Sequence, residues 1–238
     1  IEAGTGTGKS LAYLIPAVLA ATADQAHQEE NQPEQQQQTG HEDQKSEKTN
    51  EKRPRRIVIA THTIALQEQL VKKDIPVVSA VMPHEFSAVL VKGRGNYISL
   101  RRLALAKERE GSLFQYDEEV SELEGLLEWS GNTRDGSLAD LPTIPRSSVW
   151  DEVHSDSGNC MGRACPRYNE CHYFAARRRM NNAQVLVVNH ALFFSDLALR
   201  RNGVSLLPEY DIVILDEAHM VESVASDHLG VGLSSIAV

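Results

Sequence analysis

The sequence predicts an α/β fold in which helices cover both faces of a parallel sheet. Four short apolar runs, rich in β-branched residues, are separated along the chain by segments with helical periodicity. None of these runs alternates between apolar and polar residues, which is typical of strands buried on both faces. A glycine-rich loop stands before the first helical segment, and two acidic residues follow the last apolar run.

The composition excludes several classes of protein. The chain has 238 residues, of which 41% are hydrophobic, which suits one or two domains with a core. No apolar run approaches the roughly 18 residues of a membrane span, and no signal-peptide pattern is visible, so we expect a cytoplasmic protein without a membrane partner. The net charge of -9 opposes a uniformly basic surface, although bases gather in residues 92–109 and 160–182. Because the chain begins at Ile1, we expect a fragment of a longer protein.

The first element is the loop that ends in Gly8-Lys9-Ser10. Its glycines permit torsions that turn N–H groups toward phosphate oxygens, and the start of the following helix adds a favourable dipole. We expect Lys9 to reach the β and γ phosphates of ATP, and the Ser10 hydroxyl to ligate Mg²⁺. An unliganded glycine-rich turn is the alternative that this pattern alone leaves open. The residues expected to bind ATP are Ala3, Gly4, Thr5, Gly6, Thr7, Gly8, Lys9 and Ser10.

The elements that follow are predicted from apolar periodicity. An apolar helix face runs from Leu11 to Leu19, and residues 24–56 then hold no large apolar side chain, which predicts a disordered insertion. A helical stretch follows the first strand, residues 100–130 are predicted to be helical, and residues 131–170 are rich in turn residues. The predicted strands are 57–60, 88–91, 185–188 and 212–215.

Two acidic residues follow the last strand. Asp216 and Glu217 come directly after Ile212–Leu215, where a nucleotide hydrolase places acids at the carboxyl edge of its sheet. We expect Asp216 to hold Mg²⁺ through water and Glu217 to act as a general base toward the attacking water. An acid pair after a strand is common by chance, but together with the glycine-rich loop it predicts an ATPase.

Three cysteines form the third motif. Cys160, Cys165 and Cys171 are spaced C-x₄-C-x₅-C, and an odd number without a secretory signal argues against disulfides. The spacing leaves three interpretations open: unrelated buried thiols, a zinc site completed by His172 or His154, or an iron–sulfur cluster.

These motifs carry a resemblance to a known family. Asp216-Glu217-Ala218-His219 resembles the DEAH box of superfamily 2 helicases, and residues 60–70 resemble their motif Ia. The blocks at 92–97, the cysteines and 187–193 resemble, in order, those of the DinG and XPD helicases, with the spacing of the bacterial DinG branch. The resemblance implies a RecA-like P-loop domain interrupted by a mostly helical iron–sulfur domain.

The resemblance also implies roles and boundaries. His219 would couple the nucleotide site to nucleic-acid movement, and motif Ia would contact the nucleic-acid backbone. The protein would be an ATP-dependent DNA helicase that moves 5′ to 3′ on single-stranded or forked DNA as a monomer, in repair or replication. The chain alone is not expected to unwind DNA. The implied segments are an incomplete RecA-like domain (1–23, 57–91 and 184–220), the insertion (24–56), the iron–sulfur domain (92–183) and the start of a following segment (221–238).

One position departs from the family. The first of its four cluster cysteines is Ser99 here, and a hydroxyl is a poorer iron ligand than a thiolate. The resemblance therefore implies a [4Fe–4S] cluster on Cys160, Cys165 and Cys171, with a three-cysteine, serine-ligated, labile or lost cluster, or zinc, left open. A non-unwinding nucleic-acid scaffold with a structural zinc module is the competing interpretation; the intact ATP motifs argue against it. The bases expected to hold DNA phosphates include Arg101, Arg102 and Arg177 to Arg179.

Overall fold

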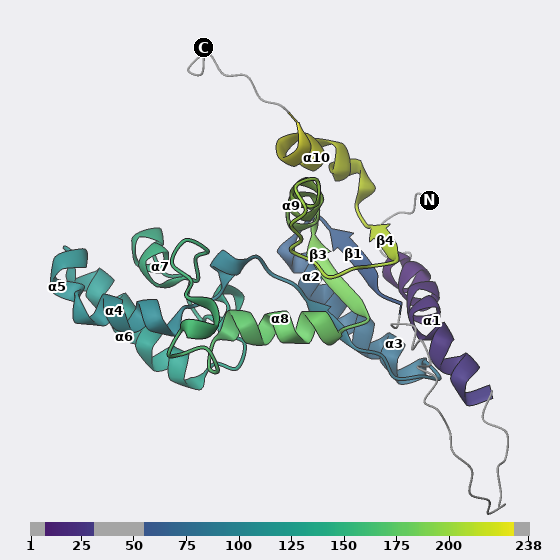
Figure 1. The fold of residues 1–238 in the computed structure, drawn as a ribbon, viewed down its shortest axis with the longest axis horizontal. Coiled ribbons are helices and arrows are strands. Elements are labelled where there is room, and N and C mark those ends of the chain that lie inside the picture. Colours follow the sequence, from purple (N-terminus) through teal and green to yellow (C-terminus); the bar gives the residue numbers. More distant parts are fainter. Residues whose placement is uncertain (1–7, 31–54, 231–238) are drawn as a thin grey trace, which may run out of the picture. The chain divides into compact units, whose positions relative to one another are not determined.

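The computed structural model describes residues 8–30 and 55–230, with side chains described outside 24–30. These residues form two compact units, which we describe separately (Figure 1). Unit 1 comprises Ile1–Leu90 and Asn182–Val238, and unit 2 comprises Val91–Asn181. The ATP-binding residues predicted at Ala3, Gly4, Thr5, Gly6 and Thr7 lie outside the described residues, as do 31–54 of the predicted insertion and 231–238 of the last segment.

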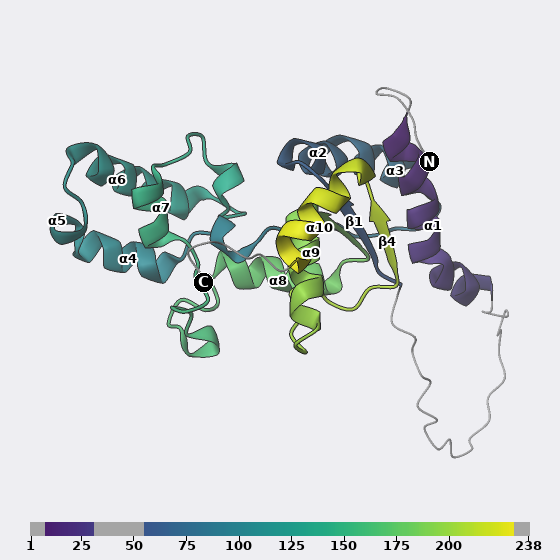
Figure 2. The same cartoon turned by 90° about the horizontal axis from the view of Figure 1, so that it is seen from above.

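Unit 1 is built on a parallel sheet with the strand order β2-β3-β1-β4. Figure 2 shows β1 and β4 side by side at one end of this order. Ile57 at the start of β1 pairs with Val185 of β3 on one side and with Ile212 of β4 on the other. Each strand lies within one residue of its predicted bounds, and the predicted α/β class with a parallel sheet is confirmed. The strands are β1 (Ile57–Thr61), β2 (Ala88–Leu90), β3 (Val185–Asn189) and β4 (Ile212–Leu215).

The two central strands of the sheet in unit 1, β1 and β3, are buried on both faces. Ile57 and Ile59 of β1 pack with Leu14 and Val18 of α1 in one apolar cluster. Val58, which alternates with them, is also fully buried, and α9 contacts β1 and β3. The helices of unit 1 are α1 (Lys9–Glu30), α2 (Ile64–Gln69), a π-helical turn (Leu70–Asp74), α3 (Ile75–Val81), α9 (His190–Arg200), a 3₁₀ turn (Ala218–Met220) and α10 (Val221–Leu229).

The first helix differs from its prediction. The insertion was expected to begin at residue 24, yet α1 continues to Glu30. Residues 23–30 consist largely of Ala, Gln and Glu, which have high helix propensity, so a helix that is already nucleated can extend through them.

Unit 2 is mostly helical. Its core holds Leu103 from α4, Leu123 from α6, and Val149 and Trp150 from α7. The stretch predicted as helical at 100–130 is broken into three helices, and α7 lies within 131–170, which was predicted to be irregular. Val149, Trp150 and Val153 of α7 share one buried face, a short apolar pattern that the surrounding turn residues conceal. The helices are α4 (Leu100–Glu108), α5 (Glu110–Leu113), α6 (Asp117–Asn132), α7 (Ser147–Val153) and α8 (His172–Asn182), with 3₁₀ turns at Arg94–Asn96, Leu138–Asp140 and Gly162–Ala164.

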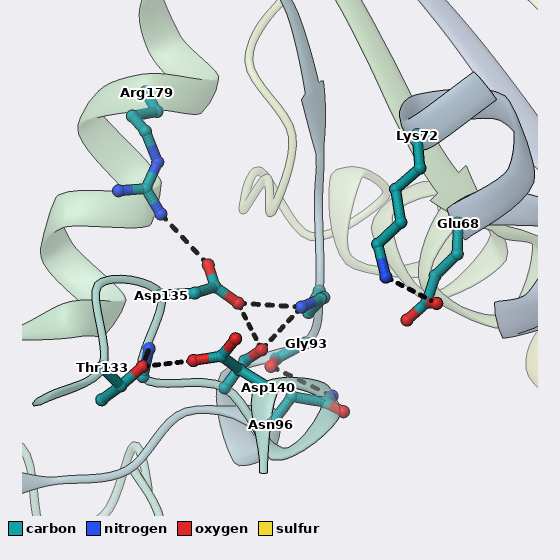
Figure 3. A network of polar contacts seen from close by, with 11 residues as sticks. Glu68, Lys72, Gly93, Asn96, Thr133, Asp135, Asp140 and Arg179 are labelled. Atoms are coloured by element: carbon teal, nitrogen blue, oxygen red, sulfur yellow. Dashed lines mark hydrogen bonds and ion pairs between the residues drawn. The ribbon is translucent and has the colours of Figure 1, made fainter. Parts of the chain in front are cut away.

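A polar network in unit 2 joins three segments that are distant in sequence (Figure 3). Lys92 Nζ lies 2.9 Å from Asp135 Oδ2 and donates to Ser137 Oγ at 2.6 Å. Arg179 of α8 approaches the other oxygen of Asp135 at 3.4 Å. Partial burial acts to raise the pKa of Asp135, but the Ser137 hydroxyl and the Lys92 charge hold it below its usual value. The network therefore contains a charged carboxylate with three hydrogen-bonding or ionic partners.

Within the described ranges, 8–30 and 55–230, no helix is both long and apolar enough to span a membrane.

Candidate functional site

The two acids after β4 lie at the carboxyl edge of the sheet. Asp216 continues the strand, because its N–H donates to the Ala60 carbonyl at 2.8 Å. Glu217 then has a φ of +51°, the one positive φ of a non-glycine residue in the described part of the chain. This left-handed backbone destabilises a residue with a Cβ by about 1–2 kcal/mol and turns the chain out of the sheet. Such strain is typical of functional sites.

Glu217 lies between two basic side chains. Lys9, the first residue of α1, places its Nζ 3.4 Å from Glu217 Oε1. His219, which is largely exposed, places its Nδ1 3.5 Å from Glu217 Oε2. The structure thus brings Lys9 together with Asp216, Glu217 and His219, although Lys9 and Glu217 are 208 residues apart in the sequence. Gly8 and Ser10, the other described residues of the predicted loop, flank Lys9 at the start of α1.

Tyr13 is a site residue that the sequence prediction missed. Its hydroxyl donates to Asp216 Oδ2 at 3.2 Å. Burial and the charge of Asp216 both raise the pKa of Tyr13, so the phenol stays a donor. The signal was present in the sequence, because Tyr13 follows Lys9 by four residues and therefore lies on the same side of α1.

The ends of β1 and β3 bring further polar residues to the same edge. Thr61 is fully buried, and Thr63 caps α2 by accepting a hydrogen bond from Leu66 N at 3.2 Å. Asn189 caps α9 in the same way, with its Oδ1 2.8 Å from Leu192 N. His190 follows it and is 1% exposed. The segment that resembles motif Ia therefore begins at the edge of the sheet that carries the two acids.

The three cysteines line one small cavity of unit 2, with a volume of about 30 Å³. Ser99, the residue at the family's first cysteine position, also lines it. The Ser99 hydroxyl caps α4, accepting from Arg102 N at 3.4 Å. Cys160 Sγ accepts from Gly162 N at 3.4 Å. Burial opposes the shift, but this bond and the nearby Arg94 and Arg101 lower the pKa of the Cys160 thiol, which favours a thiolate.

The histidines considered for zinc lie outside that cavity. Neither His154 nor His172 lines it. Moreover, no group of three or more His, Cys, Asp or Glu side chains in the described residues is placed to hold one metal ion. A single zinc ion needs ligands about 2.0–2.3 Å from one centre. In the described residues the three thiols thus share one cavity, but they do not form an assembled metal site.

The arginines expected to contact DNA have structural partners as well. Arg102 donates to the carbonyls of His154 and Asp151, both at 2.7 Å, and Arg101 donates to that of Asn159 at 2.6 Å. With Arg109, they also line an open groove of about 160 Å³ along α4. These bonds hold the guanidinium groups in place, and the groove has a basic lining.

Comparison with known proteins agrees with these observations. Residues 159–238 match the DEAD_2 family model. The chain is 34% identical to the ATP-dependent DNA helicase YoaA of Escherichia coli K12, over 99% of the chain and 32% of that protein. It is 31% identical to the ATP-dependent DNA helicase DinG of Photobacterium profundum, over 95% of the chain and 30% of that protein. For the ATP-dependent helicase DinG of Mycobacterium tuberculosis the identity is 32%, over 96% of the chain and 33% of that protein.

The chain spans about a third of the length of these curated relatives. The DEAD_2 match and the similarity along nearly the whole chain confirm the resemblance of its motifs to helicases of the DinG type.

Proposed function

We propose that the protein is an ATP-dependent DNA helicase of the DinG type, in which unit 1 binds and hydrolyses ATP. The observation that carries this proposal is the meeting of Lys9, at the start of α1, with the Asp216–Glu217 pair at the carboxyl edge of a parallel sheet. Similar proteins are named ATP-dependent DNA helicases, which supports DNA as the partner.

Lys9 and Glu217 exchange partners in the proposed reaction. Their ion pair is 3.4 Å long and both side chains are partly exposed, so it contributes little, about 0–1 kcal/mol. Phosphate oxygens of ATP carry more charge and displace Glu217 from Lys9. The released carboxylate then accepts a proton from the attacking water.

Asp216 is held for a different role. The Tyr13 hydroxyl fixes one of its oxygens, and the backbone bond to Ala60 fixes its main chain. Asp216 and Ser10 would hold Mg²⁺, whose chemistry is to neutralise charge on the phosphates. Residues 3–8 of the loop would complete the phosphate site in this proposal. His219, beside Glu217, would report the nucleotide state to the DNA-binding surface.

Unit 2 would contact the DNA and carry an iron–sulfur cluster. The groove along α4, with Arg101, Arg102 and Arg109, suits a phosphodiester backbone. Cys160, Cys165 and Cys171 would ligate the cluster, because all three line one cavity and thiolates are its usual ligands. A bound cluster cross-links the segments that carry its ligands. Ser99 is the weak member of the set, since its hydroxyl already caps α4.

The test is ATP hydrolysis by the full-length protein with and without single-stranded DNA. We expect DNA to stimulate ATP hydrolysis. Lys9→Ala should lower the DNA-stimulated rate of hydrolysis by a factor of at least about 10². Lys107→Ala is the matched control, because Lys107 is an exposed lysine of unit 2 paired only with surface carboxylates in the described structure. Unwinding of a forked duplex with a 5′ tail then tests the helicase activity. Wild-type protein that is not stimulated by DNA would instead favour the scaffold interpretation.

A further inference from the structure

His190 occupies an unusual position in unit 1. It is the first residue of α9 and is 1% exposed. Its Nε2 lies 3.2 Å from the Ala60 carbonyl oxygen, near the end of β1. The same oxygen accepts the N–H of Asp216, at 2.8 Å, from the end of β4. One carbonyl thus receives two hydrogen bonds from two different elements.

The hydrogen bond fixes the state of the imidazole ring. A carbonyl oxygen can only accept, so Nε2 carries the proton. Nδ1 is buried and has no hydrogen-bond partner among the described residues. Burial lowers the pKa of His190, against the opposing effect of the Ala60 and Asp216 backbone, so the ring is neutral near pH 7. The ring of His62 lies 6.1 Å away, between centroids.

Stability alone gives a weak reason for a histidine here. A buried nitrogen without a partner destabilises the fold, and an apolar side chain would avoid that loss. The ring does, however, join the strand β1 to the first turn of α9 through a single bond. Residues Thr61 to Thr63, which resemble motif Ia, follow that bonded peptide directly.

We propose that His190 is a positioning residue that transmits movement of the Thr61–Thr63 segment to Asp216 through the Ala60 carbonyl. This inference rests on the proposed function, in which that segment contacts DNA and Asp216 serves hydrolysis. β1 lies between β3 and β4 in the sheet, so a shift of its last peptide reaches the β4 end directly. Without the His190 bond, the Ala60 carbonyl keeps the bond from Asp216 N but loses its direct bond to the α9 side chain.

The test compares four variants of the full-length protein. His190→Leu removes the donor, and His190→Asn displaces it, because the Asn amide corresponds to Nδ1. His190→Gln keeps a donor at the Nε2 position. Gln184→Leu is the matched control: Gln184 is also a buried polar residue of unit 1, hydrogen-bonded to Ser87 beside the amino-terminal ends of β2 and β3.

The readout is the ratio of DNA-stimulated to basal ATP turnover, together with KM for ATP and the melting temperature. We expect His190→Leu and His190→Asn to lower this ratio about tenfold, because a factor of about ten corresponds to the loss of one hydrogen bond. The KM for ATP should change less than about twofold. His190→Gln should stay within about threefold of wild type. Gln184→Leu should lower the melting temperature but keep the ratio.

The outcomes separate the two ideas. If the wild type is stimulated by DNA and the Asn and Gln variants behave alike, the inference about His190 is wrong and the proposed function stands. If Gln184→Leu lowers the ratio of DNA-stimulated to basal ATP turnover as much as His190→Asn does, the effect comes from a loss of stability and the inference is again wrong. A wild type without stimulation overturns both.

Discussion

Asp196 offers the sharpest test of how unit 1 is held together. Its carboxylate is fully buried in α9 and accepts hydrogen bonds from Leu206 N at 2.6 Å, Leu207 N at 2.8 Å and Arg200 Nε at 2.6 Å. These bonds close the loop that leads from α9 to β4, and therefore to Asp216. Asp196→Asn keeps the size of the side chain but sets an N–H₂ or a neutral oxygen against the guanidinium.

The loss of stability expected from Asp196→Asn depends on the hydrogen bonds that the variant keeps. A hydrogen bond to a charged group contributes about 1.5–3 kcal/mol, and breaking a buried ion pair removes about 3–5 kcal/mol. Arg200 is 23% exposed on its side chain and also binds Glu209 and the Leu207 and Pro208 carbonyls, so it is not left unpaired. We therefore expect Asp196→Asn to lower the free energy of local opening by about 2–3 kcal/mol.

Hydrogen exchange with mass spectrometry measures this loss peptide by peptide. A loss of 2–3 kcal/mol corresponds to exchange that is roughly 30- to 150-fold faster in peptides from the loop and β4. Glu68→Gln is the matched control, because Glu68 makes an exposed ion pair with Lys72 within α2 and the following turn and should change stability by less than about 0.5 kcal/mol. Protection within about threefold of wild type in Asp196→Asn would refute the argument.

Three further predictions concern unit 2. Gly136→Ala should destabilise it by about 3 kcal/mol or more, since Gly136 has a φ of +65° and an added Cβ would lie 2.1 Å from His172 Cγ. Lys92→Met should lower the free energy of unfolding by about 1–2 kcal/mol at pH 7. Folding lowers the pKa of Asp135, so this loss should become smaller as the pH falls below about 4 and Asp135 becomes protonated in the folded protein. Ser99→Cys should raise the iron content toward about four per chain with broad visible absorbance. Thermal and urea unfolding check the first two, and metal analysis of anaerobically purified protein checks the third.

Each of these predictions has a control or a contrary result. Gly125→Ala, at an open position inside α6, should stabilise unit 2 by up to about 1 kcal/mol, so equal effects of the two glycine changes would contradict the steric argument. A Lys92→Met deficit that is the same at pH 3 and pH 7 would show that Asp135 is not the partner that matters. One equivalent of zinc without colour in Ser99→Cys would rule out the cluster.

Much of unit 1 could be predicted from local pattern. The apolar run before Asp216 is a strand with the predicted bounds, because a short run of branched apolar residues favours an extended strand, although β4 itself is only partly buried. The position of Asp216 beside the end of β1 follows from the rule that parallel strands present their carboxyl ends at one edge.

The missed features depend on contacts between residues distant in sequence. Asp196 appears as an ordinary polar residue of a helix until the loop to β4 folds over it and supplies two N–H donors. Lys92, Asp135 and Arg179 are surface residues by composition, and only the fold places them together. The helix breaks in unit 2 were missed because the prediction of one helical stretch over 100–130 rested on the apolar face of Val120, Leu123 and Leu127, and residues 107–112, which hold no apolar side chain, were included in it.

The insertion of unit 2 between β2 and β3 sets the order in which the chain is able to fold during synthesis. β1 and β2 do not pair with each other, since β3 lies between them. The partner that joins them emerges only after unit 2; Arg56 and Ala183, which are hydrogen-bonded beside the start of β1, are 127 residues apart. At ribosomal speeds of about 5–20 residues per second, β1 and β2 remain without their shared partner strand for several seconds. All of unit 2 precedes β3 in the chain, so its three cysteines leave the ribosome before the parallel sheet of unit 1 can form.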